Sequence, residues 1–300
     1  MRPLDWLLLL LLSVLWGAAF FFIAVALPEV PPFSLVLARV AIAALVLVPI
    51  ILLVGLGLPR TLRAWRDYAV LAILNNLLPF SLIAYGQTRI GSGLASVLIA
   101  TTPLFTVLAL RLLAGEPLTR AKLGGVLLGI AGVAVLTGAG GLGAGSPAAA
   151  GVLCVLGAAL CYALSAFWMR RVREMPPLVS AVSQLVCSSI LLLPIAALAD
   201  RFWELPPPGF PAAASMLALA VLSTALAYLV FFRLGATAGP ANAMLVTLLI
   251  PVTGTGLGAL VLGEHLAAHQ IAGALVIASG LVVIDGRLAG WLSGRRLQAA

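Results

Sequence analysis

The chain has 300 residues, of which 63% are hydrophobic and 9% are charged, and its formal net charge is +8 at pH 7. Its mean hydropathy is +1.21. Soluble domains carry about 25% charged residues, so this composition excludes an ordinary water-soluble protein. The basic residues lie between apolar runs, which indicates membrane topology and not nucleic-acid binding.

Apolar runs bounded by Pro, Gly or charged residues follow one another along the chain, each close to the ~20 residues that cross a bilayer as a helix. The first run is too long for the ~7–15-residue apolar core of a signal peptide, so we interpret it as a helix. The connecting loops are short, which places any functional site within the helix bundle. The sequence predicts an all-α integral membrane protein with ten transmembrane helices, at residues 4–27, 33–54, 68–88, 92–113, 120–138, 149–170, 178–199, 211–232, 239–262 and 269–286.

The Lys and Arg residues are distributed unevenly between the two sides of these helices. Fourteen of the seventeen lie at the N-terminus, in the loops after even-numbered helices or in the C-terminal tail. Arg89 and Arg201 lie on the opposite side, and Arg39 lies inside the second helix. Because basic residues in short loops stay cytoplasmic, we expect both termini to face the cytoplasm.

The second half of the chain repeats features of the first. Pro103 and Pro251 are 148 residues apart, as are the Gly-Glu pairs that begin at Gly115 and Gly263. Near the start of each half the separation is 145 residues, as between Pro49 and Pro194. Five helices per repeat is an odd number, so the second copy must insert upside down, and inverted repeats of this kind are typical of transporters. We predict a first repeat at 1–143, a second, inverted repeat at 144–286 and a basic cytoplasmic tail at 287–300.

These features together resemble a known family. The pattern Ser13–Gly17 in the first helix, the segment Leu37–Arg39 in the second and the duplicated Gly-Glu pairs are similar to EamA-type members of the drug/metabolite transporter superfamily. The resemblance covers essentially the whole chain. It implies a ten-helix transporter, in a family whose substrates include amino acids, other metabolites and drugs.

The nine carboxylates all fall in loops or at helix ends. Proton-coupled carriers usually place an Asp or Glu within the membrane, so the sequence favours transport without obligatory proton coupling. We interpret Glu264, with His265 and His269, as helix-capping and loop residues, and a proton-sensitive cluster is the alternative. The three cysteines have neither C-x-x-C spacing nor neighbouring ligands, so no metal site or cofactor is predicted.

Arg39 is the one cation well inside a predicted helix. A long Arg side chain can reach the membrane interface from such a position, and this structural interpretation stays open. The alternative is that its guanidinium attracts or orients a substrate carboxylate.

Polar and aromatic residues within the helices predict a substrate site. Asn76, Phe80, Ile83 and Gln87 recur at helical spacing and form one mixed face. Pro79, Pro103 and Pro251 should interrupt their helices and expose backbone groups. Inverted repeats bring the middles of corresponding helices together, so we expect the site near the midplane. Its predicted residues are Trp16, Asn76, Phe80, Ile83, Gln87, Thr101, Thr102, Tyr162, Ser165, Thr224, Tyr228 and Thr247.

The predicted function is transport of small polar metabolites by alternating access at this site, by an exporter or a facilitator. Hydroxyl and amide groups beside aromatic rings favour amino acids, bulky and aromatic ones included, and resemble what the family's amino-acid exporters carry. A proton-coupled drug/metabolite antiporter is the alternative. An intramembrane enzyme is disfavoured because no H-E-x-x-H motif or catalytic triad occurs. We expect a monomer or homodimer in a bacterial-type inner membrane, with the small-molecule substrate and the lipid bilayer as its partners.

Overall fold

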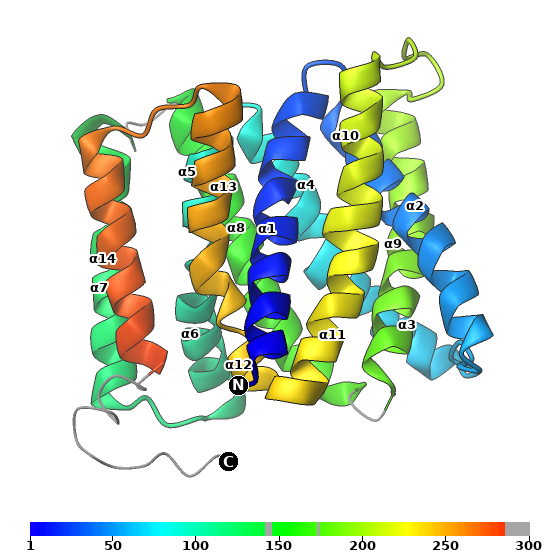
Figure 1. The fold of residues 1–300 in the computed structure, drawn as a ribbon, viewed down its shortest axis with the longest axis horizontal. Coiled ribbons are helices and arrows are strands. Elements are labelled where there is room, and N and C mark those ends of the chain that lie inside the picture. Colours follow the sequence, from blue (N-terminus) through cyan, green and yellow to red (C-terminus); the bar gives the residue numbers. More distant parts are fainter. Residues whose placement is uncertain (142–145, 173–174, 286–300) are drawn as a thin grey trace.

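The structure is a computed structural model that describes residues 1–141, 146–172 and 175–285 (Figure 1). Within these ranges the chain is helical and contains no strand. The predicted tail at 287–300 lies outside the described residues. The α-helices are α1 (Pro3–Ala26), α2 (Pro32–Leu53), α3 (Leu62–Ala72), α4 (Leu78–Gln87), α5 (Ser92–Ile99), α6 (Thr102–Ala114), α7 (Arg120–Gly141), α8 (Pro147–Trp168), α9 (Pro177–Asp200), α10 (Phe210–Ala220), α11 (Ala227–Ala238), α12 (Pro240–Ala243), α13 (Val246–Leu262) and α14 (Ala268–Asp285).

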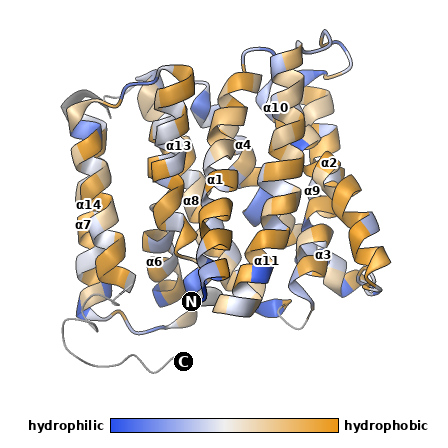
Figure 2. Cartoon of the chain, in the orientation of Figure 1, coloured by the Kyte–Doolittle hydropathy of each residue, from blue (hydrophilic) through white to orange (hydrophobic). Residues whose placement is uncertain are grey.

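The helices form a membrane-type bundle. In the part of the chain that the structure describes, eight continuous helical segments are long and apolar enough to cross a bilayer, and Val246–Leu262 and Ala268–Ile284 are two shorter apolar helices. Each of these ten segments overlaps one predicted span. Figure 2 shows hydrophobic residues along most of each helix, with many of the hydrophilic ones near the helix ends. This is the distribution that burial of helices in lipid requires.

Two predicted boundaries were wrong because charged residues were assigned to loops. The third span begins at Leu62 and not at residue 68, since the Thr61 side chain accepts a hydrogen bond from the Ala64 N–H and starts the helix before the apolar run. The eighth span was predicted to end at residue 232, before Arg233. It continues to Ala238 and stops at Gly239, whose φ of 88° lies in the region that favours glycine.

The fourth and ninth spans are each divided in two. The fourth is interrupted at Ala100 and Thr101, and Pro103 is the second residue of α6, where a missing N–H costs no helical hydrogen bond. The ninth is interrupted between α12 and α13, before Val246. Pro251 lies inside α13 and does not break it, contrary to the prediction, because the helix loses only one backbone donor there and continues.

Two short π-helices widen the third and eighth spans, η1 (Ile73–Leu77) before α4 and η3 (Val221–Leu226) before α11. Pro79 is the second residue of α4 and follows η1 directly. The first residues of η1 and η3 are 148 residues apart, the separation that also relates Pro103 to Pro251. Turns of this kind occur often at functional sites, because one extra residue per turn redirects the side chains.

The helices pack in pairs that set the shape of the molecule (Figure 1). The α7/α14 pair lies at one end and α2 packs on α9 toward the other, while α1 contacts α10 and α13 and α8 contacts α4 and α6. Glycines bring α7 and α14 together. A Cβ added at Gly125 would lie 2.6 Å from the Gly280 carbonyl oxygen, and one added at Gly280 would lie 2.7 Å from that of Gly125. This close contact fits the packing role of small residues between membrane helices.

Candidate functional site

Arg39 lies within the bundle, with 6% of its surface exposed. Its Nε donates a hydrogen bond to Thr224 Oγ1 of η3 at 2.9 Å. Its guanidinium carbon lies 3.6 Å from the centre of the Phe80 ring, so the cation rests on an aromatic face. The phenol groups of Tyr162 and Tyr228 are close enough to interact with the guanidinium electrostatically. This enclosed position differs from that of an arginine that extends to the membrane interface.

The π-helical turns position the hydrogen-bonding groups around this cation. Thr224 accepts from Arg39 and also donates to the Leu219 carbonyl five residues earlier, at 2.9 Å, a spacing typical of a widened turn. Asn76 of η1 accepts from the Tyr228 hydroxyl at 3.2 Å and donates to Ser188 Oγ of α9 at 3.2 Å. One asparagine therefore links the third, seventh and eighth spans.

A second asparagine joins a parallel chain of hydrogen bonds. Asn75 donates to Gln184 Oε1 of α9 at 3.0 Å and accepts from Ser165 Oγ of α8 at 3.1 Å. Gln184 in turn donates to the Ser180 carbonyl at 3.1 Å. Buried amide groups left without partners would cost about 1–3 kcal/mol each, so these bonds hold η1, α8 and α9 in register.

These side chains form one polar group in the middle of apolar helices, which we call the Arg39 cluster. Six residues of the predicted substrate site belong to it, together with Arg39. The site prediction did not include Asn75, Gln184 and Ser188. Gln184 lies 145 residues after Arg39, the same separation as Pro49 and Pro194, so the repeat pattern contained a signal for it. The cluster comprises Arg39, Asn75, Asn76, Phe80, Tyr162, Ser165, Gln184, Ser188, Thr224 and Tyr228.

Aromatic side chains continue from the cluster along α1 and α11. The Trp16 ring centre lies 5.3 Å from that of Phe231, and Tyr228 stacks near Phe232 at 6.0 Å. Trp16, like Tyr162 and Tyr228, remains partly exposed although it packs on the main hydrophobic core. These rings offer an apolar wall beside the polar groups.

The remaining predicted site residues have other surroundings. Ile83 is buried in the hydrophobic core, and both side-chain amide atoms of Gln87 are enclosed and lack a hydrogen-bond partner among the described residues. Thr101, Thr102 and Thr247 each donate to a backbone carbonyl three residues earlier on their own span. They stabilise the interruptions of the fourth and ninth spans, and no described contact joins them to Arg39.

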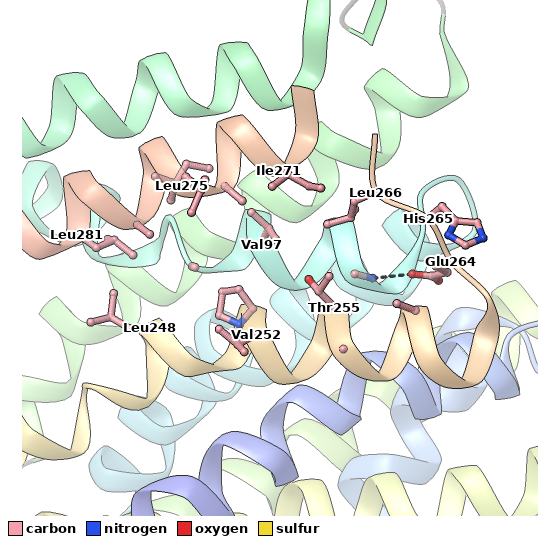
Figure 3. A pocket seen from close by; sticks show the side chains of 18 residues that line it. Val97, Leu248, Val252, Thr255, Glu264, His265, Leu266, Ile271, Leu275 and Leu281 are labelled. Atoms are coloured by element: carbon pink, nitrogen blue, oxygen red, sulfur yellow. Dashed lines mark hydrogen bonds between the residues drawn. The ribbon is translucent and has the colours of Figure 1, made fainter. Parts of the chain in front are cut away.

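A separate cavity of about 560 Å³ lies between α5, α13 and α14 (Figure 3). Its lining is mostly apolar, with Val97, Leu248 and Leu275 among the side chains that face it. Of the predicted substrate or hinge residues it includes Pro251 alone. The cavity lacks the dense hydrogen-bonding groups of the Arg39 cluster, so we take the cluster as the candidate site.

Glu264 lies at one end of this cavity and caps a helix (Figure 3). Its carboxylate accepts hydrogen bonds from the Ser92 and Gly93 N–H groups at 2.8 and 2.9 Å, at the start of α5. Gly258 leaves room for it, since a Cβ there would lie 2.6 Å from the carboxylate. This geometry agrees with the capping interpretation. Its counterpart Glu116, 148 residues earlier, pairs with Arg170 instead.

The Arg39 cluster is suited to binding a small solute. It combines one cation, several hydroxyl and amide groups and aromatic rings, and among the described residues it contains no carboxylate or histidine. Within the described ranges no three His, Cys, Asp or Glu side chains gather as they would around a metal ion. An enclosed set of this kind can orient a small solute with a polar head and an apolar body.

Comparisons with known proteins match both halves of the chain to one transporter family. Residues 5–138 and 149–285 each match the EamA-like transporter family. The chain is 30% identical over 280 residues to an uncharacterized transporter, YvbV, of Bacillus subtilis, covering 93% of this chain and 90% of the other. It is also 30% identical over 295 residues to a probable amino-acid metabolite efflux pump of Salmonella typhimurium, covering 93% and 94% of the two chains. A solved crystal structure with 20% sequence identity has a similar fold, with a TM-score of 0.68 over 99% of this chain and 100% of the other.

Proposed function

This chain belongs to the EamA-like transporter family, and from that membership we propose that it carries small polar metabolites through the Arg39 cluster by alternating access. Amino acids are the first candidate substrates, including bulky and aromatic ones. Membership of a transporter family supports a transporter over an enzyme, and one relative is named as a probable amino-acid metabolite efflux pump. The proposal is tested by counterflow of labelled amino acids in proteoliposomes that contain the purified protein.

The observation that carries the proposal is an enclosed arginine without a carboxylate partner. The ion pairs among the described residues are Arg2–Asp5, Arg170–Glu116 and Arg201–Glu204, and none includes Arg39. Ionisable residues inside membrane bundles are costly and typically mark substrate or ion pathways. A substrate carboxylate is the natural counter-charge for a guanidinium that the protein leaves without one.

We further propose that the halves 1–143 and 144–286 are inverted repeats that rock about this site. Two observations support the repeat. Each half matches the family separately, and η1 and η3 begin 148 residues apart, the separation of Pro103 and Pro251. Two hydrogen bonds of the cluster join the halves: Arg39 of the first half donates to Thr224 of the second, and Asn75 of the first donates to Gln184 of the second. Substrate sites of inverted-repeat transporters lie at such interfaces, where either half can move against the other.

We predict that both termini face the cytoplasm. The start of α1 and the end of α14 lie on the same face of the bundle (Figure 1), and fourteen of seventeen basic residues fall on that side of the predicted topology. A fluorescent reporter fused after Ala300 should be active, whereas an alkaline phosphatase fusion at that position should be inactive. The opposite pair of results would reverse the topology.

Transport is expected not to require a proton gradient. Glu264, the one carboxylate on the cavity lining, is held by two backbone N–H groups, and the Arg39 cluster contains no acid. Uptake into proteoliposomes should therefore reach the same plateau with and without an imposed pH gradient. Accumulation above equilibrium that an uncoupler abolishes would contradict this. Loss of that accumulation in Glu264→Gln, with Glu204→Gln as a matched exposed control, would assign the coupling to Glu264.

A further inference from the structure

The guanidinium of Arg39 has unused hydrogen-bond donors. Nε bonds Thr224, while Nη1 and Nη2 have no hydrogen-bond partner among the described residues. Neither Nη atom is fully enclosed by protein, in contrast to the unpartnered hydroxyl oxygens of Ser183 and Ser223. The Nη groups therefore border space that a molecule the size of water can reach. A guanidinium whose face is covered by Phe80 presents these N–H groups at its edge, where a planar anion binds.

The hydroxyl of Tyr162, whose phenol interacts electrostatically with Arg39, is a second available donor. The Tyr162 hydroxyl has no hydrogen-bond partner among the described residues. Its oxygen is not fully enclosed, and the residue is partly exposed. Tyr228, the other phenol near Arg39, already donates to Asn76. Tyr162 is therefore the phenol near Arg39 whose hydroxyl hydrogen is still available to an anion bound at the guanidinium.

The cluster offers an ammonium group no charged partner, because among the described residues it contains no carboxylate. Its side-chain amide oxygens are neutral acceptors that each already accept one hydrogen bond, Asn75 from Ser165, Asn76 from Tyr228 and Gln184 from Asn75, and so keep one free lone pair. The α-ammonium of an amino acid lies next to its carboxylate, so binding the carboxylate at Arg39 places a second positive charge near the guanidinium. In an enclosed site that repulsion is weakly screened.

We propose that this site recognises its substrate by the carboxylate, through the Nη groups of Arg39 and the hydroxyl of Tyr162, and does not require an ammonium group. Carboxylic acids without a free amine, such as 2-hydroxy acids and N-acylated amino acids, are then substrates at least as good as the corresponding amino acids. This inference rests on the proposed transport function and specifies its substrate class.

Three ligands with one side chain test the proposal: L-phenylalanine, 3-phenyllactate without the ammonium, and phenylalanine amide without the carboxylate. Their affinities for the purified full-length protein are measured by calorimetry. Phenyllactate should bind at least as tightly as phenylalanine, and the amide at least about tenfold more weakly, because the amide lacks the charge-assisted hydrogen bonds to the guanidinium. Three results would each overturn the proposal. They are equal binding of the amide and phenylalanine, failure of phenyllactate to bind where phenylalanine does, and no binding by any of the three ligands.

Variants locate the effect. Arg39→Gln should weaken both acids at least about tenfold and leave the amide unchanged. Arg89→Gln is the matched control, because Arg89 also covers an aromatic ring, that of Tyr85, but is exposed. Tyr162→Phe removes one hydroxyl and should lower the affinity for both acids several-fold without unfolding the protein. This variant tests the site if Arg39→Gln does not fold. Unchanged affinity for the acids in Tyr162→Phe would refute the role of that hydroxyl. Unchanged affinity in a folded Arg39→Gln would refute the site.

Counterflow separates this inference from the transport function on which it rests. Phenyllactate that binds through Arg39 but exchanges no faster than in empty liposomes would refute transport while leaving the carboxylate site standing. Rapid exchange of phenylalanine, with phenyllactate neither binding nor competing, would support transport and refute the carboxylate site.

Discussion

Asn76→Ala is expected to lower transport by at least about tenfold. The substitution removes the acceptor of the Tyr228 hydroxyl and the donor to Ser188, and with them a link between η1, α9 and α11. A hydrogen bond of this kind contributes about 0.5–1.5 kcal/mol, and without it Tyr228 would no longer be held beside Arg39. Initial rates of counterflow in proteoliposomes, at equal amounts of reconstituted protein, measure the effect.

The control for this experiment is Ser279→Ala. Ser279 is an exposed residue of α14 whose hydroxyl bonds only the Leu275 carbonyl of its own helix, so its loss should leave the rate unchanged. Tyr228→Phe removes the same hydrogen bond from the other side and should reproduce part of the loss. Normal rates and substrate affinity in both Asn76→Ala and Tyr228→Phe would show that the substrate site lies elsewhere.

Gly125→Leu is expected to prevent stable packing of α7 on α14. A Cβ at this position would lie 2.4 Å from Ile284 Cγ1 and 2.6 Å from the Gly280 carbonyl oxygen, so the helix backbones must separate. Overpacking a close contact costs about 1–3 kcal/mol or more, and a leucine that separates two backbones should fall at or above the upper end of that range. The yield of monodisperse protein in detergent, and its thermal unfolding, should both fall sharply.

The adjacent residue supplies the comparison. Gly124 lies on the same helix, and a Cβ added there would meet no atom within 4 Å, so the identical change Gly124→Leu should alter stability by less than about 0.5 kcal/mol. The two variants have the same composition and hydrophobicity and differ only in the helix face that carries the leucine. Equal stability of the two proteins would mean that the α7/α14 contact contributes little to the fold.

Hydropathy located the eight described helical segments that are long enough to cross a bilayer and the two shorter apolar ones, because an apolar run of about twenty residues has one stable arrangement in lipid. It misplaced the start of α3 and the end of α11, where Arg63 and Arg233 lie within helical turns, because a charged residue at a helix end can remain helical and still reach water. The π-helical turns were not predicted. Their geometry depends on contacts with other helices, such as that of Thr224 with Arg39, which no local sequence pattern encodes.

The candidate site was predicted in part for the same reasons. Deep polar residues such as Asn76, Tyr228 and Thr224 stand out in an apolar helix because burial needs a partner. Which partner they find depends on helix packing, so the bond between Asn75 and Gln184 was missed. Thr101 and Thr102 were included in the predicted site because they are also polar residues within apolar helices. Their hydroxyls instead donate to backbone carbonyls of their own span, as Ser and Thr hydroxyls in helices often do.

The positions of Arg39 and Gln184 bear on how such a protein could have arisen. They are separated by 145 residues, the spacing that relates the early parts of the two halves. In an ancestor made of two identical, oppositely inserted chains, any residue here would appear twice, and two guanidiniums would repel each other within one enclosed site. Two copies that have diverged in sequence escape that constraint, because each can mutate alone. Under the proposed repeat, a single positive charge at the site therefore requires two halves that are no longer identical.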